Sequence, residues 1–330
     1  MSKNIIIYHT SVDRNSRLDE LDVLVEAEFV SENLKKLGYS QKILPFIYDI
    51  KRIKSEIKKI NPDFIFNLVE SMGGTDSLAY LAPLIFDHLK APYTGCPTKA
   101  LFQTSDKLIT KEILNQNGIN TPKYLSLDKY GKLEKPLGQE CIKKREKFLI
   151  KYVREHASVG IDERELVLFE DREDIIETLK ERFGKYFAEQ YIDGREFNIS
   201  LIGNPIRILP IAEMRFDDYP KGKPKIVGYN AKWDEKSFEY KHTRRNFEFD
   251  ESDMPLLKNL EDICRKCWKI FDLRGYARID FRVDENNIPY VLEINTNPCI
   301  SPNAGFVAAV EREKLSHIKV IEEIIKNLNR

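Results

Sequence analysis

Apolar and polar residues repeat with two different periods along the first hundred residues of the chain. Three short apolar runs are typical of buried strands, at residues 4–8, 42–46 and 63–69. Between and after them, apolar residues recur at helical spacing, over residues 21–37, 50–60 and 78–89. Because strand–helix–strand repetition is typical of parallel strands joined by crossover helices, we predict an N-terminal parallel α/β domain over residues 1–104.

The pattern then changes and predicts a small central α+β domain over residues 105–195. Ser105 is the expected N-cap of its first helix, which Gly118 ends. A strand, a charged helix and two more strands follow, at residues 148–153, 171–182, 186–192 and 197–202, the last of them just past the boundary at 195.

The remaining residues, 196–330, predict a C-terminal α+β domain with an antiparallel sheet. A long polar loop is expected over residues 217–249, followed by a helix with a clear buried stripe at 256–271. Cys264 and Cys267 have the spacing of a redox or metal motif, but both lie on that stripe and no second pair follows, so we expect them to pack in the core.

Composition and charge exclude several classes of protein. The 330 residues include 53 Lys plus Arg and 53 Asp plus Glu, and this zero net charge argues against a nucleic-acid or membrane-surface binder. No uncharged apolar stretch approaches the about 20 residues of a spanning helix, and the first residues do not resemble a signal peptide. Five cysteines, an odd number, do not form a disulfide framework, so we expect a cytoplasmic protein.

The residues with the most informative chemistry lie in a predicted hairpin near the end of the chain. Segments 278–283 and 290–295 alternate at period two around a turn, which predicts antiparallel strands. The alternation places five polar side chains on one face, Arg278, Asp280, Arg282, Glu293 and Asn295. It directs the apolar side chains toward the core, namely Ile279, Phe281, Leu292 and Ile294.

Two carboxylates and an amide oxygen on this face suit Mg²⁺, which prefers hard oxygen ligands. Arg278 beside them could neutralise the charge that develops during phosphoryl or acyl transfer. The alternative is a solvated sheet face with an ordinary salt bridge.

Two lysines favour a phosphate site. Lys151 ends an apolar strand and precedes a loop of small residues at 154–160, whose backbone N–H groups could approach phosphate oxygens. Lys107 lies near a helix N-terminus, where a phosphate is favoured. Taken singly, these features also fit a surface loop and a solvated lysine.

Residues 189–196 favour an adenosine site. Glu189 and Glu196 flank the apolar Ile192, so this segment offers an apolar slot and acceptors for the edge of a base and the hydroxyls of a ribose.

In their order along the chain these features resemble the ATP-grasp superfamily, and in particular its D-alanine–D-alanine ligase branch. The resemblance covers nearly the whole chain and is carried by six segments, at residues 92–95, 105–108, 151–160, 189–196, 229–232 and 275–298. It implies a three-domain ATP-grasp architecture in which the central domain is a lid. It also implies an ATP-dependent ligase that joins a carboxylate to an amine through an acyl phosphate, and a homodimer.

The resemblance implies a role for each matching residue. Lys107 and Lys151 would hold the nucleotide phosphates, and Lys232 would reach the terminal phosphate. The adenosine site would be formed by Glu189, Ile192 and Glu196. Two Mg²⁺ ions, which Mn²⁺ could replace, would be held by Asp280, Glu293 and Asn295. Catalysis would involve Lys232, Arg278 at the acyl phosphate, and Ser158 in the small-residue loop.

The substrate end departs from the ligase pattern. The family's Gly-Gly-x-Ser-x-Glu segment, whose acid binds the first amino acid, is replaced by residues 9–14 without a glutamate in register. Ala157 and Trp233 stand where the family has serine and tyrosine, and Ala304-Gly305 stands where it has Ser-Leu. We therefore expect amino-acid or small-peptide substrates other than two D-alanines. The alternatives are a nucleotide-binding protein without ligase activity and a variant D-alanine–D-alanine ligase.

Candidate substrate contacts come from three places in the chain. His9, Asp13 and Arg14 follow the first strand, where loops of parallel sheets gather ligands. Arg244 and Arg245 belong to a basic cluster that either binds an anionic substrate or is simply solvated. Ala304 and Gly305 are candidates by position. A nucleophilic role for Cys299 would need a base partner, which the sequence does not identify.

Overall fold

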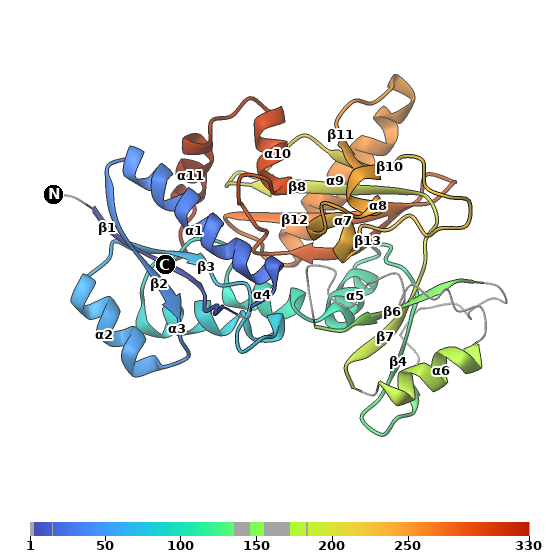
Figure 1. Ribbon diagram of the computed structural model, residues 1–330, viewed down its shortest axis with the longest axis horizontal. Helices are drawn as coiled ribbons and strands as arrows, with labels where there is room; N and C mark the ends of the chain where they lie inside the picture. The colour runs from blue at the N-terminus through green and yellow to red at the C-terminus, as the bar shows by residue number, and fades with distance from the viewer. Residues whose placement is uncertain (1–2, 15, 135–145, 155–171, 183, 330) are drawn as a thin grey trace.

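Three β-sheets organise the protein (Figure 1). The structure, a computed structural model, describes residues 3–14, 16–134, 146–154, 172–182 and 184–329. One sheet is parallel and the other two are antiparallel, so the predicted combination of α/β and α+β layers is confirmed.

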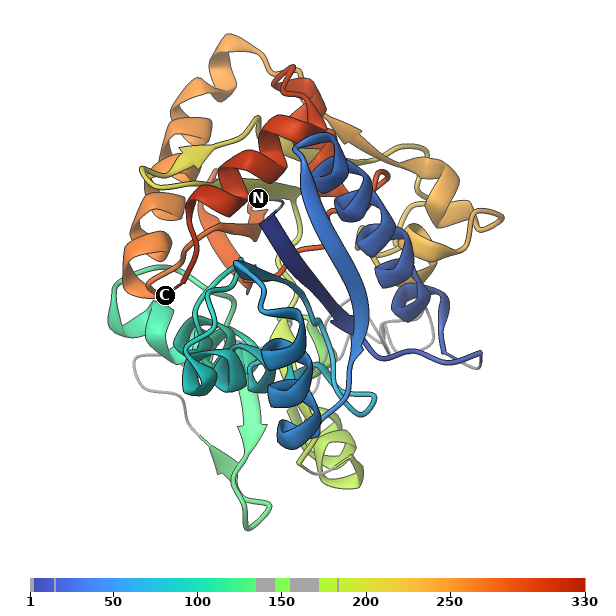
Figure 2. The same ribbon diagram turned by 90° about the vertical axis from the view of Figure 1, so that its left-hand side faces the viewer.

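The parallel sheet has the strand order β2–β1–β3 and lies at the N-terminal end of the molecule (Figure 2). Its strands are β1 (Lys3–Thr10), β2 (Tyr39–Phe46) and β3 (Phe64–Leu68). The helices that follow them are α1 (Leu18–Lys36), α2 (Ile50–Ile60), the 3₁₀ turn η1 (Asp76–Leu78) and α3 (Leu81–Leu89). Since neighbouring side chains of a strand point to opposite faces, Ile5 and Ile7 pack against α1, whereas Ile6 and Tyr8 pack against α2 and α3.

A small antiparallel sheet with the order β5–β4–β7–β6 forms the second layer. Its strands are β4 (Tyr124–Leu127), β5 (Leu133–Glu134), β6 (Phe148–Tyr152) and β7 (Tyr186–Gln190). Helix α6 (Arg172–Glu181) covers one face and packs through Ile175 and Leu179. This sheet therefore has a small core of its own.

The third sheet has the order β11–β10–β8–β12–β13, with β9 beside β8. Its strands are β8 (Arg195–Ile202), β9 (Arg207–Ile208), β10 (Ala212–Phe216), β11 (Thr243–Asn246), β12 (Tyr276–Val283) and β13 (Pro289–Asn295). The predicted hairpin is confirmed as β12 and β13, which pair antiparallel.

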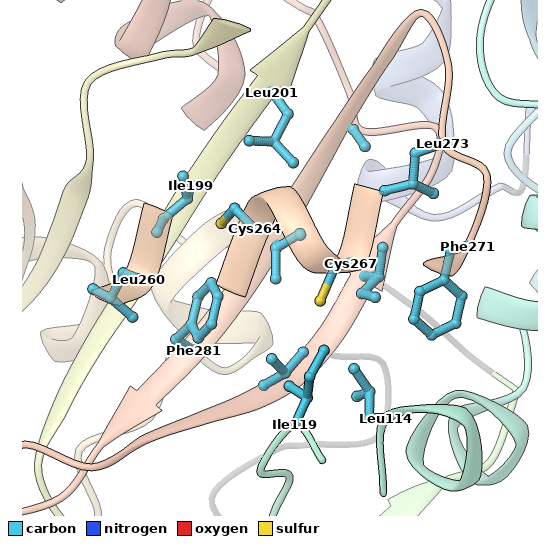
Figure 3. Packing of buried hydrophobic residues seen from close by; sticks show 14 of the residues in the cluster. Leu114, Ile119, Ile199, Leu201, Leu260, Cys264, Cys267, Phe271, Leu273 and Phe281 are labelled. Carbon is cyan, nitrogen blue, oxygen red and sulfur yellow. The ribbon is translucent and has the colours of Figure 1, made fainter. Parts of the chain in front are cut away.

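Helix α9 (Met254–Ile270) covers the apolar face of this third sheet. Cys264 and Cys267 are fully buried there among Leu260, Phe271 and Phe281, which confirms that they are core residues (Figure 3). The 3₁₀ turn η2 (Glu251–Asp253) precedes this helix.

Two local predictions need correction. The helix α5 (Lys107–Gln116) is capped by Asp106, whose carboxylate accepts hydrogen bonds from the backbone N–H groups of Leu108 and Ile109, while Ser105 ends the preceding helix α4 (Thr98–Thr104). Residues 217–249 are not one long loop, because they contain α7 (Tyr229–Trp233), α8 (Phe238–His242) and β11.

The N-terminal and third sheets share one hydrophobic core. The C-terminal helices α10 (Gly305–Arg312) and α11 (His317–Lys326) place Phe306 and Ile321 against the same cluster as Ile5 of β1 and Tyr276 of β12. Leu114 of α5 packs into the core under the third sheet. The predicted boundaries at 104/105 and 195/196, which fall after α4 and within β8, stay a prediction.

The turn between β7 and β8 depends on a glycine. Gly194 has a φ of +148°, and a Cβ atom there would lie 2.0 Å from the carbonyl oxygen of Val283 on β12. Backbone strain and a contact of this kind both disfavour any side chain.

We predict that Gly194→Ala lowers the free energy of unfolding by about 3–5 kcal/mol, from backbone strain together with steric overlap. Gly222→Ala is the matched control, because Gly222 also has a positive φ, of +89°, but nothing lies within 4 Å of the position that the new methyl group would take. Strain alone should cost it about 1–2 kcal/mol. Urea denaturation measures both, and equal losses would contradict the steric argument.

Candidate active site

A cavity of about 730 Å³ lies between the three sheets. Its lining includes residues from the end of β1, from β6 and β7, and from β8, β12 and β13. The site is therefore built from all three layers.

The polar face of the hairpin forms one wall of this cavity. Arg278 is opposite Asn295, and Asp280 is opposite Glu293, and all four line the cavity. The Arg278 guanidinium donates from Nε and Nη2 to the two carboxylate oxygens of Asp280, at 2.8 Å each. Asn198 of β8 donates to the same carboxylate at 2.9 Å. The predicted convergence of these groups is thus present.

One residue of the hairpin was predicted on the wrong face. A β-bulge shifts the register after Asp280, so that Phe281 is opposite Val291 and Leu292 is extra on β13. Leu292 consequently lines the cavity beside Glu293 instead of facing the core. Simple alternation could not predict this, because a bulge breaks the period of two.

These residues fit a hard divalent cation. Asp280 and Glu293 supply carboxylate oxygens from adjacent strands, and Asn295 supplies an amide oxygen, which accepts from the backbone N–H of Asn297 at 3.1 Å. Such a set of oxygens is typical of Mg²⁺ sites.

Arg278 beside this set keeps its positive charge. Burial alone would lower the pKa of Arg278, but Asp280 beside it raises that pKa, so the arginine stays charged.

The lysines predicted at the phosphates also line the cavity. They are Lys107 at the start of α5, Lys151 on β6 and Lys232 on α7. Lys107 Nζ is 3.9 Å from Glu293 Oε2, so the phosphate and metal regions adjoin. Burial lowers the pKa of Lys232, and the nearby Arg278 lowers it further.

Glu189 is held between two lysines. Its Oε1 is 2.7 Å from Nζ of Lys111, its Oε2 pairs with Lys151, and the Lys111 and Glu189 side chains are only 1% and 2% exposed. Burial alone would raise the pKa of Glu189, but Lys111 and Lys151 together lower it, so the carboxylate stays charged. Lys111 also donates to Thr121 Oγ1 at 2.8 Å and to the carbonyl of Pro122 at 3.1 Å.

Sequence reasoning missed Lys111, although a signal for it exists. Lys111 lies on the buried stripe of α5 with Lys107, Thr110 and Leu114, at helical spacing. A lysine on such a stripe needs a buried acid as its partner.

The residues predicted to contact the adenosine also line the cavity. Ile192 and Glu196 line it with Glu189. Glu196 Oε2 is 3.1 Å from Nη2 of Arg282, and Nη1 of the same arginine donates to the carbonyl of Gly194 at 3.1 Å. Burial raises the pKa of Glu196, and Arg282 opposes this shift.

The predicted substrate contacts divide into two groups. Arg244, Arg245, Ala304 and Gly305 line the cavity, and burial lowers the pKa of Arg245. Among the described residues of the lining, His9, Asp13 and Arg14 are absent, and their contact with the substrate stays a prediction. Thr10 at the end of β1 and Arg17, Glu20 and Asp22 around the start of α1 line the cavity. Ser158 lies outside the described residues.

Several acidic residues at the substrate end were not foreseen. Glu20 and Asp22 of α1, Glu70 after β3 and Asp76 of η1 all line the cavity. Alternation and motif spacing contain no signal for them, because they come from separate elements that only the fold brings together.

Comparisons with known proteins agree with this geometry. The family model described as D-ala D-ala ligase C-terminus matches residues 113–326, more than half of the chain. The D-alanine–D-alanine ligase of Pelagibacter ubique is 29% identical over 331 residues, covering 99% of this chain and 98% of that protein. The ligase of Aquifex aeolicus is 28% identical, covering 90% and 92%.

Solved structures show the same fold. The D-alanine–D-alanine ligase from Bacillus anthracis, crystallised with ATP, superposes with a TM-score of 0.72 at 21% identity, over 98% of this chain and 97% of that one.

In the part of the chain that the structure describes, no helix combines the length and the apolar character needed to span a membrane. The chain belongs to the D-alanine–D-alanine ligase family and is an ATP-grasp ligase of the type that forms carbon–nitrogen bonds.

Proposed function

We propose that this protein uses ATP to join a carboxylate to an amine, through an acyl phosphate, and that its substrates are not two D-alanines. The observation that carries this proposal is the joint lining of one cavity by Arg278, Asp280, Glu293 and Asn295 and by the three lysines of the phosphate region. A reaction between two anions, a carboxylate and a triphosphate, needs this concentration of positive charge and oxygen ligands.

The nucleotide would lie along β6, β7 and α5. Lys107 and Lys151 would contact its phosphates, and Lys232 of α7 would reach the terminal phosphate. Glu189, Ile192 and Glu196 would contact the adenosine. The B. anthracis relative was solved in complex with ATP, which supports ATP as the nucleotide.

Asp280, Glu293 and Asn295 would hold two Mg²⁺ ions, or Mn²⁺ in their place. When bound, such ions neutralise charge on the phosphate oxygens during transfer. Asn198 and Arg278 orient the Asp280 carboxylate, because each donates a hydrogen bond to it.

The chemistry proceeds in two balanced steps. An oxygen of the substrate carboxylate attacks the terminal phosphorus, the bond to ADP breaks, and ADP leaves with the electron pair. The amine nitrogen then attacks the acyl carbon, phosphate leaves, and the nitrogen loses a proton to form the amide. Arg278 lines the cavity next to Asp280, where it would stabilise the negative charge that develops in both steps.

Two features support substrates other than two D-alanines. Ala304 and Gly305 stand where the ligase pattern has a Ser-Leu pair, so the pocket lacks that hydroxyl at this position. The second feature is the contact between Gly305 and Arg245. A Cβ atom at Gly305 would lie 3.4 Å from Nε of Arg245, so a larger residue at position 305, such as the leucine of the pattern, would crowd this arginine. The names of the relatives favour the second candidate, a D-alanine–D-alanine ligase with a variant pocket.

Release of ADP with a panel of carboxylate and amine pairs separates the two candidates. We expect D-alanine alone to give no ADP release above the ATP-only background, and at least one other amino-acid or peptide pair to give it. Turnover with D-alanine comparable to the best pair would favour the variant D-alanine–D-alanine ligase. Mg-ATP stabilisation of the protein without turnover for any pair would refute the ligase proposal.

We predict that Glu293→Gln lowers kcat for ADP release by at least about 10²-fold, because a neutral amide is a poorer ligand for a hard cation. A higher concentration of Mg²⁺ should recover part of the activity. Glu285→Gln, in the exposed turn of the same hairpin, is the matched control and should behave like the wild type. Full activity of Glu293→Gln at low Mg²⁺ would contradict the metal assignment.

Lys111 is a positioning residue in this proposal, because it contacts Glu189 and not the nucleotide. We predict that Lys111→Met lowers the free energy of unfolding by about 3–5 kcal/mol, since it leaves a buried carboxylate with one partner fewer. It should also weaken ATP binding by about tenfold, as measured by calorimetry. Lys99→Met, on an exposed position of α4, is the control. Unchanged ATP affinity in a folded Lys111→Met protein would refute the positioning role.

A further inference from the structure

A partly buried cluster of two glutamates and a cysteine lies beside the proposed reaction centre and has no role in the chemistry described above. Glu26 of α1, Glu70 after β3 and Cys299 after β13 place one oxygen or sulfur atom each within 4.8 Å of one another. Glu70 and Cys299 line the cavity, and Glu26 lies directly behind them with 1% of its surface exposed. Three separate elements thus converge on one point.

Glu26 points to a missing ligand. Its Oε1 accepts a hydrogen bond from the backbone N–H of Ile300 at 2.7 Å, but among the described residues its buried Oε2 has no hydrogen-bond partner. A buried carboxylate oxygen without a donor is costly. A donor that enters from the cavity would remove this cost.

The surroundings of Glu70 are strongly acidic. Burial raises the pKa of Glu70 well above its usual range, and Glu26, Asp76 and Asp22 raise it further. Burial likewise raises the pKa of Glu26 to about 8. A bound cation would lower both pKa values and let the carboxylates ionise.

Arg278 connects the cluster to the proposed reaction centre. This arginine interacts electrostatically with Asp280 and Glu293 of the metal region and with Glu70 and Cys299 of the cluster. A carboxylate held at Arg278 therefore has the acidic cluster within reach of the rest of its molecule.

We propose that the cluster of Glu26, Glu70, Asp22 and Cys299 binds a side-chain ammonium group of the substrate, so that the acyl donor is a dibasic amino acid. This rests on the proposed ligase function. One α-ammonium offsets a single negative charge, whereas three acids, Asp22, Glu70 and Asp76, line this end of the cavity besides Glu20, which pairs with Arg17. Glu26 lies behind them. The excess of acids matches a ligand with a second positive charge.

An ammonium fits the cluster better than a metal ion does. The Cys299 thiol donates to Asp22 Oδ2 at 3.0 Å, and its burial, together with the nearby acids, raises its pKa well above the usual range. Zinc binds the thiolate, which is disfavoured here, and Mg²⁺ avoids sulfur. An ammonium group donates three hydrogen bonds, and the oxygens of the nearby carboxyl groups can accept them.

The test compares amino acids that differ only in the side-chain ammonium, lysine against norleucine and ornithine against norvaline, each as both enantiomers. Binding is measured by calorimetry on the full chain with Mg²⁺ and a non-hydrolysable ATP analogue, and ADP release is measured with ATP. We expect the dibasic member of the best pair to bind about 10- to 100-fold more tightly than its neutral partner.

Glu70→Gln and Glu26→Gln should each reduce this preference to near one, and two variants keep the test valid if one of them fails to fold. Glu32→Gln, exposed on the same helix as Glu26, is the control and should keep the preference of the wild type.

Three outcomes would overturn the proposal. Equal binding of dibasic and neutral amino acids, with both weakened by Glu70→Gln, would make this an α-ammonium site. Zinc retained through gel filtration in excess Mg²⁺, and lost in Glu70→Gln, would make it a metal site. Turnover without any preference for dibasic amino acids would contradict the ammonium subsite but leave the ligase function standing. Lysine binding that depends on Glu70, without turnover, would instead contradict the ligase function and leave the subsite standing.

Discussion

The other groups of the site lie around the ion pair between Arg278 and Asp280 on β12. Strand β12 is central in its sheet, since it is hydrogen-bonded to β8 on one side and to β13 on the other. Asn198 from β8 and Glu293 from β13 are therefore placed at register positions beside Asp280. A buried ion pair contributes little net stability by itself, but removing one partner is costly. The pair thus constrains position more than it stabilises the fold.

Much of the fold could be predicted from the sequence because the signals are local. Apolar runs and helical stripes predicted the parallel sheet, and alternation around a turn predicted the hairpin. What failed was also local: Asp106 and not its neighbour Ser105 caps α5, since only its carboxylate reaches the free N–H groups. The bulge at Leu292 depends on the register between two strands, which alternation within one strand does not contain.

The site divides into a part that spacing could predict and a part that it could not. The residues assigned to nucleotide and metal belong to short contiguous motifs, in strands, in the turn before β8 and in helices α5 and α7, and those within the described residues all line the cavity. The substrate end is assembled from α1, β3 and the segment after β13, whose separation along the chain is large. Residues 9–14 illustrate the difference, because the first strand was predicted well, whereas Thr10 of this segment lines the cavity and the three predicted contacts, His9, Asp13 and Arg14, are not in the lining.

The core shared by the first and third sheets has a consequence for how the protein can be divided and how it can open. Phe306 and Ile321 pack with Ile5, so a fragment that began at residue 113, where the family match begins, would expose the apolar faces of α10 and α11 to water. The small sheet of β4 to β7 has a separate core around Ile150 and Ile175. Rigid-body opening for entry of the nucleotide would accordingly be a swing of this small sheet against the other two layers, which move as one piece.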